Sequence, residues 1–216
     1  WAKGFNRSLG LILFLLCASF LVWGLLCCGR SIREALGDYR QLLRQSGRAP
    51  CDLLSRCGGA AVCINVGLTG AIATGYILAI GGDLNGPTLA GIFTIMGFAA
   101  WGKHPGNMLP VMAGAVLAGL ILPGFSLTDP AIQFSVLFCT TLSPISGSYG
   151  WPFGILAGFL HICLVQRTGA PVCGLNLYNN GFTGGLVATV LYGILTPLGL
   201  LRKSEARDTT SRFSPL

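Results

Sequence analysis

The sequence predicts an all-α, polytopic integral membrane protein with about seven hydrophobic segments. Hydrophobic residues make up 52% of the 216 positions and charged residues 10%, whereas an average soluble domain carries roughly 25% charged residues. Between residues 57 and 201 the only formal charges are Asp83, Lys103, Asp129 and Arg167. Glycine occurs 32 times, about twice its usual share, which favours close packing and broken helices in a membrane.

The first expected element is a transmembrane helix within residues 1–28, because the apolar run from Leu9 to Cys28 has basic residues on both sides. Residues 29–56 contain six arginines and scattered leucines, which predicts a basic cytoplasmic linker that is partly an amphipathic surface helix. The net charge of +7 does not indicate nucleic-acid binding, since the basic residues flank apolar segments. A partner of that class is therefore excluded.

Residues 57–201 are expected to form a membrane domain with broken helices. The run from Gly58 to Ile80 is long enough to cross a bilayer, and small residues at every fourth position, from Gly59 to Ala79, predict a face packed against another helix. Later apolar segments are too short for a hydrocarbon core about 30 Å thick, so some must be half-helices or re-entrant. They comprise residues 88–101, 108–122, 131–142 and 151–165.

A last full-length span is expected at residues 182–201, followed by a cytoplasmic polar tail at 202–216. If the linker is also cytoplasmic, an even number of crossings separates the two, and either six crossing segments or two re-entrant pairs satisfy this. The turn from Gly102 to Asn107 is interpreted as cytoplasmic, with an anchoring lysine. The chain begins with Trp1 rather than methionine, so we expect it to be part of a longer protein whose N-terminal half is missing.

Two breaks share the pattern N-G-x-T, at Asn85 to Thr88 and at Asn180 to Thr183, and each is expected to open an apolar helix. This spacing indicates a degenerate internal repeat. Repeats in many transporters place the N-termini of broken helices at the membrane midplane, where free N–H groups meet a polar solute. Two interpretations stay open: Asn and Thr only cap the helices, or they also contact a solute.

Other polar residues near these breaks complete the candidate substrate pathway. Asp83 is a candidate coupling acid if it lies at membrane depth, and a surface residue if it lies at a helix mouth. Tyr178 and Asn179 precede the second motif, and His161 is a candidate proton relay or a hydrogen-bonded packing residue. An intramembrane enzyme with Ser148 and His161 is a remote alternative, because their spacing on one short segment does not favour contact. We expect no catalytic residue, metal or cofactor.

The runs Gly81 to Thr88, Gly102 to Pro105 and Gly174 to Gly181 resemble an uncharacterised bacterial multi-pass membrane family, the domain of unknown function with family number 1576. The resemblance covers about residues 50–200 and implies a polytopic membrane protein without a known activity. A weaker likeness is to urea transporters, carried by Tyr178 to Gly181 and Trp151 to Phe153. It implies a pathway for a small neutral solute.

The function expected from the sequence is a channel or secondary transporter for a small polar solute in the bacterial inner membrane. Its partners are then the lipid bilayer, the solute and, in a homo-oligomer, further copies of the chain. The competing hypothesis is a non-transporting membrane scaffold or assembly subunit, in which the breaks and the small residues serve packing only.

Overall fold

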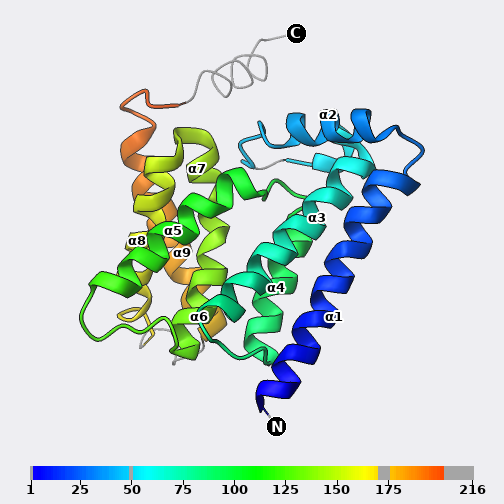
Figure 1. Cartoon of the computed structure of the whole chain (residues 1–216). Coiled ribbons are helices and arrows are strands. Elements are labelled where there is room, and N and C mark those ends of the chain that lie inside the picture. Colours follow the sequence, from blue (N-terminus) through cyan, green and yellow to red (C-terminus); the bar gives the residue numbers. More distant parts are fainter. Residues whose placement is uncertain (1, 49–50, 170–175, 202–216) are drawn as a thin grey trace.

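The structure, a computed structural model, describes residues 2–48, 51–169 and 176–201, and every regular element in these ranges is a helix (Figure 1). The all-helical fold class is thereby confirmed for these residues. The longer helices run back and forth between two ends of the molecule, and α2 lies across one end (Figure 1). Their bounds are α1 Ala2–Val22, continued by the π-helical turn Trp23–Cys27, α2 Ile32–Leu42, α3 Leu53–Ala79, α4 Gly86–Phe98, α5 Pro105–Ile121, α6 Pro130–Phe138, the 3-10 turn Cys139–Leu142, α7 Ser143–Tyr149, α8 Trp151–Val165 and α9 Asn176–Leu195.

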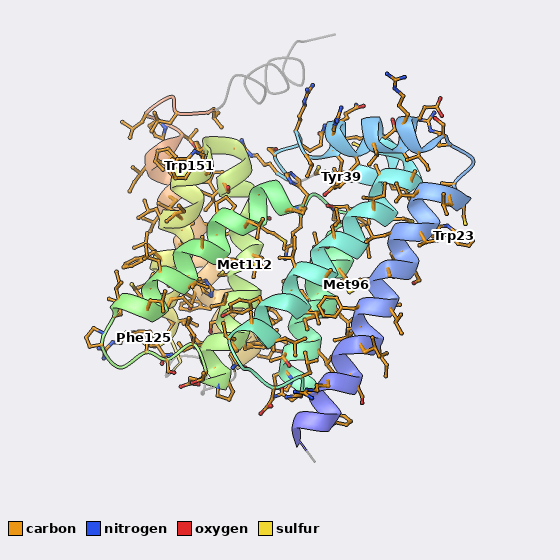
Figure 2. All side chains as sticks on the ribbon, in the orientation of Figure 1. Trp23, Tyr39, Met96, Met112, Phe125 and Trp151 are labelled. Carbon is orange, nitrogen blue, oxygen red and sulfur yellow. The ribbon has the colours of Figure 1, made fainter. Side chains whose placement is uncertain are left out.

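Helices α1, α3 and α4 form one group, and α5 to α9 form another (Figure 1). Helix α3 packs along α1 at a close backbone approach, since a Cβ at Gly67 would lie 2.6 Å from the carbonyl oxygen of Cys17. Helix α4 contacts both α3 and α6 and so joins the groups. One hydrophobic core runs through both groups and includes Leu13 of α1, Met96 of α4 and Met112 of α5 (Figure 2).

The closest helix contact joins α5 and α8. A Cβ at Gly158 would lie 1.8 Å from the carbonyl oxygen of Val111, and one at Gly114 would lie 1.9 Å from that of Ile155. Neither position has room for a side chain, so both glycines are required for the two backbones to touch. Small residues thus set a second helix interface, in addition to the one between α1 and α3.

The predicted small-residue face of α3 is wrong in part. Gly67 meets α1 as expected, but a Cβ at Gly75 would meet nothing within 4 Å, and Ala79 is exposed. The start of this helix also differs from the expectation, because α3 begins at Leu53 and Gly58 is a kink inside it with a φ of 81°. Asp52 explains the earlier start, since its side chain accepts hydrogen bonds from the backbone N–H groups of the first turn.

The prediction that the last helix begins at Phe182 is also wrong. Helix α9 spans Asn176–Leu195, so Asn180 and Thr183 lie inside it, and the polar run that precedes the motif is helical from Asn176 onward. The propensity of Asn for caps and turns is weak here against the contacts that α9 makes with α8. The internal repeat is therefore not matched by two equivalent helix starts. The predicted cytoplasmic tail at 202–216 lies outside the described residues.

Two helices in the described ranges are long and apolar enough to cross a membrane, Gly4–Cys27 and Leu53–Ala79. Helices α4, α5 and α8 are apolar but shorter. The charged residues that the sequence places between 57 and 201 all lie outside the helix interiors: Asp83 and Lys103 precede α4 and α5, Asp129 caps α6 and Arg167 follows α8. These features suggest association with a membrane.

The expected linker is a docked element rather than a free connection. Ser31 and Glu34 form a capping box that starts α2, and Arg30 pairs with Asp38 at 2.9 Å. Beyond α2, the carbonyl oxygen of Gln45 lies 2.8 Å from Nε2 of His104. The linker therefore packs on the connection between α4 and α5.

Candidate functional site

The first N-G-x-T motif is a helix cap. Asn85 Oδ1 accepts from the backbone N–H of Thr88, and Thr88 Oγ1 accepts from the backbone N–H of Asn85 at 2.8 Å. Thr88 Oγ1 also donates to backbone carbonyls of this turn. Asn85 therefore caps α4, as the sequence predicted, and both side chains have protein partners. Whether they also contact a solute stays a prediction.

Asp83 lies on the surface at the turn between α3 and α4. It is exposed, and its carboxylate accepts a hydrogen bond from Nδ2 of Asn6. Oδ1 of Asn6 in turn accepts from the backbone N–H of Leu84 at 3.0 Å. This pair of bonds fastens the start of α1 to the turn, and it favours the surface interpretation of Asp83 over a position at membrane depth.

The second motif belongs to a buried polar cluster between α8 and α9. Asn180 Oδ1 lies 3.0 Å from Nε2 of His161, and Asn179 Nδ2 donates to the carbonyl oxygen of Val165 at 2.6 Å. Thr168, just beyond α8, bonds both Asn179 and Thr183. The sequence named Asn179, Asn180 and Thr183 as part of a substrate pathway; in the structure they link two helices, and the pathway role stays a prediction.

Two members of the predicted pathway point in different directions. Tyr178 is 67% exposed, so its side chain is not buried as the cluster is. His161 is fully buried, and its Nδ1 has no hydrogen-bond partner among the described residues.

A cavity of about 460 Å³ separates the first motif from the start of α9, with Gly86 and Pro87 on one side and Leu177 on the other. Mainly apolar residues line this cavity.

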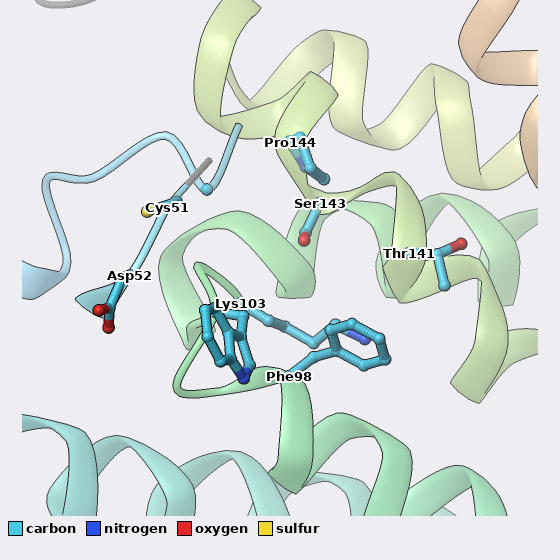
Figure 3. Close-up of a pocket in the computed structure, with 9 residues that line it drawn as sticks. Cys51, Asp52, Phe98, Lys103, Thr141, Ser143 and Pro144 are labelled. Carbon is cyan, nitrogen blue, oxygen red and sulfur yellow. The ribbon is translucent and has the colours of Figure 1, made fainter. Parts of the chain in front are cut away.

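A larger pocket, of about 530 Å³, lies at the end of the molecule where α2 crosses the helices. Figure 3 shows that its wall is assembled from the end of the linker, the end of α4, the loop before α5 and the segment that leads into α7. The volume suits a small ligand. The lining residues are Gly47, Cys51, Asp52, Phe98, Trp101, Lys103, Thr141, Ser143 and Pro144.

Lys103 is the unusual member of this lining, because it is only 5% exposed. Its Nζ donates to Thr140 Oγ1 at 2.7 Å and lies 5.5 Å from the centroid of the Phe98 ring. In the part of the chain that the structure describes, no carboxylate pairs with it. Burial disfavours the charged form and lowers the pKa of Lys103 from 10.5 to about 8, so the side chain is still mostly cationic at neutral pH.

The backbone on both sides of Lys103 is held by buried amides. Asn65 of α3 donates from Nδ2 to the carbonyl oxygens of Ala99 and Lys103, at 2.8 and 2.7 Å. Asn107 of α5 donates to the carbonyl oxygen of Gly102 at 2.8 Å and accepts from the backbone N–H of His104. These bonds fix the loop, and with it the position of the lysine.

The sequence predicted Lys103 to be the anchoring residue of a cytoplasmic turn, and the anchoring role is wrong because the side chain is deeply buried. One sequence feature could have identified Lys103 as a candidate site residue: it is the single lysine between residues 57 and 201. An isolated lysine in an apolar region indicates a functional position, as an isolated acid does.

The fold and these sites define a helical protein with apolar, membrane-length helices and polar clusters at the helix ends. Comparison with protein families identifies the family: the model of the protein of unknown function DUF1576 matches residues 31–197. The chain belongs to this family, as the sequence motifs indicated. A search of curated proteins and a search of solved structures each gave no match.

Proposed function

We propose that the chain is a multi-pass protein of the bacterial plasma membrane that acts as a channel or secondary transporter for a small polar solute. The alternating direction of the helices in Figure 1 and the position of the charged residues at helix ends support a multi-pass arrangement. Residues 29–56, which contain six arginines, comprise α2 and the segments on either side of it, so we assign this end to the cytoplasm by the positive-inside rule.

The observation that carries the proposal is the buried cation Lys103, which is one of the residues that line a 530 Å³ pocket. A charge is costly to bury, and charged side chains inside membrane proteins mark solute and ion pathways. The pocket lies where the two helix groups meet, between the α4 end and the α7 start. A solute that enters from the cytoplasmic end therefore reaches the contact between the groups.

The test is solute flux in liposomes that contain the full-length protein. Vesicles are placed in hyperosmotic urea, glycerol or lactate, and light scattering follows their reswelling. Urea is included because of the likeness to urea transporters. At least one solute is expected to enter faster than into empty vesicles, and Lys103→Met is expected to lose this gain while Arg33→Met, an exposed arginine of α2, keeps it. Equal rates in all vesicles for every solute reject transport.

A non-transporting scaffold or assembly subunit is the competing function. It is favoured by the internal hydrogen bonds that occupy Asn85, Thr88, Asn179, Asn180 and Thr183. Cysteine substitution at Asp83, Asn85, Thr88, Asn180 and Thr183, in a background without native cysteines, separates the two. Labelling of the positions in both motifs by a water-soluble thiol reagent supports an aqueous route. Protection of all but the exposed position 83 supports the scaffold.

A further inference from the structure

The ammonium of Lys103 has unused capacity to donate hydrogen bonds. It carries three N–H groups, and the described residues give it one hydrogen-bond acceptor, Thr140 Oγ1, and the face of the Phe98 ring. Thr140 is itself engaged, since its Oγ1 donates to the carbonyl oxygen of Leu137 at 2.6 Å. A neutral hydroxyl and a ring do not balance a buried positive charge. The site therefore favours an anion.

The one carboxylate in the described lining is committed elsewhere. Asp52 accepts from the backbone N–H groups of Leu54 and Ser55 and from Oγ of Ser55 at the start of α3. These hydrogen bonds lower the pKa of Asp52, so it stays ionised as a helix cap and makes no ion pair with Lys103 among the described residues. In Figure 3, Asp52 lies on the opposite side of the pocket from the Phe98 ring.

The rest of the lining is mainly apolar, with hydroxyl groups from two residues. Phe98 and Trp101 are 52% and 63% exposed, and Pro144 lies on the far wall. Ser143 is buried and Thr141 is exposed, and both border the same space. One cation, aromatic walls and a hydroxyl form a site for a singly charged group on an apolar body.

We propose that this pocket binds a small monocarboxylate with an apolar body, of about the size of benzoate, and that Lys103 is the counter-ion of its carboxylate. This deepens the proposed function by naming the class of solute, and it rests on that function only for the step from binding to transport. A neutral solute lacks the charge that the buried ammonium requires, and a dianion leaves one charge without a partner in a lining that also contains Asp52.

The first experiment measures binding of benzoate to the purified full-length protein in detergent, by calorimetry and by the shift of the melting temperature. Benzamide is the neutral control of the same shape. Benzoate is expected to bind and to stabilise the protein, and benzamide is not. Lys103→Met is expected to weaken benzoate binding about tenfold or more, because a charge-assisted hydrogen bond is lost. Arg33→Met removes the same charge from an exposed position and is expected to bind benzoate normally.

Equal binding of benzoate and benzamide overturns the proposal, and so does full benzoate affinity in folded Lys103→Met. If that variant does not fold, acetylation of the wild-type protein replaces it. An amine-reactive reagent is applied with and without benzoate, and mass spectrometry compares Lys103 with Lys3 and Lys203, the other lysines of the sequence. Protection of Lys103 by benzoate alone, and not by benzamide, supports the site. Equal labelling of Lys103 with and without benzoate rejects it.

A membrane lipid carries a similar charge on an apolar body, so a second arm uses nanodiscs. Benzoate affinity that is equal in phosphatidylcholine and in phosphatidylglycerol supports a soluble carboxylate. Loss of benzoate binding only in phosphatidylglycerol overturns this assignment and makes the lipid headgroup the occupant.

The binding and flux experiments distinguish a failure of the proposed anion site from a failure of the proposed transport function. Benzoate binding without flux of any solute rejects transport and keeps the anion site, whereas urea flux without benzoate binding rejects the anion site and keeps transport.

Discussion

The contact between α5 and α8 gives the sharpest prediction, because it leaves no space at Gly158. In Gly158→Ala the new Cβ would lie 1.8 Å from the carbonyl oxygen of Val111, 1.6 Å short of the 3.4 Å at which ordinary contact begins. The neighbour is helix backbone and not the end of a flexible side chain. The helices must therefore separate along their length, and the variant is expected to lose stability.

Overpacking typically costs about 1–3 kcal/mol when side chains can yield. Since a rigid carbonyl is met here, we expect a loss of about 3 kcal/mol, near the upper end of that range. For a chain of this size each kcal/mol lowers the melting temperature by about 2–4 °C, so Gly158→Ala is expected to melt about 6–12 °C below the wild type. The assay is thermal unfolding in detergent, followed by the reaction of buried cysteines such as Cys139 with a thiol-reactive dye.

Gly193→Ala is the matched control, because it also replaces a glycine inside a helix, and its Cβ would meet nothing within 4 Å. It is expected to melt at the wild-type temperature or slightly above, since Ala favours a helix more than Gly does. If Gly158→Ala melts within about 2 °C of Gly193→Ala, a difference worth no more than about 1 kcal/mol, the close approach of α5 and α8 does not hold and the reasoning is refuted.

Three further outcomes are expected from melting curves of the same kind. The wild type gains stability between pH 8 and pH 10.5, because the pKa of Lys103 is about 8 in the folded protein and 10.5 ordinarily, so the folded state loses its proton first. Lys103→Met lacks this part of the pH dependence, and identical profiles would exclude a depressed pKa. Asn85→Ala loses the cap of α4 and about 1 kcal/mol, and an unchanged melting temperature would contradict the capping role. Thr183→Val removes the hydrogen bond to Thr168, and because the Thr168 hydroxyl keeps its bond to Asn179, the expected loss is about 1 kcal/mol. Stability equal to the wild type would show that this bond contributes nothing.

Features with a local physical cause could be predicted from the sequence. Asn85 followed by Thr88 before an apolar run predicts a capped helix, and the structure has that cap. The apolar segments likewise correspond to helices, because a segment without charges and rich in leucine has few alternatives in an apolar environment. Most errors lie at helix starts, because α3 is capped by Asp52 and begins at Leu53, and α9 begins at Asn176, both before the apolar runs.

Features set by contacts between distant segments could not be predicted. Thr183, like Thr88, follows an Asn-Gly pair, yet the run before Thr183 is helical, because Asn179 and Asn180 have hydrogen-bond partners on α8. The small-residue pattern of α3 is longer than the one on α8, but the closest approach lies at Gly158. A pattern within one segment does not say which partner segment will fill the space opposite it.

The distinction between local and long-range contacts also explains why the sequence predicted a site at the N-G-x-T motifs whereas the structure favours one at Lys103. The polar groups of each motif are close together in the sequence. Because of this closeness they can hydrogen-bond one another as a helix cap, as Asn85 and Thr88 do. The environment of Lys103 is assembled from distant segments, with Thr140 37 residues away and Asn65 38 residues away. The described neighbours of Lys103 fix its position but do not neutralise its positive charge. A ligand with a negative charge would neutralise it, which is why the proposed function is based on the pocket and not on the repeated motif.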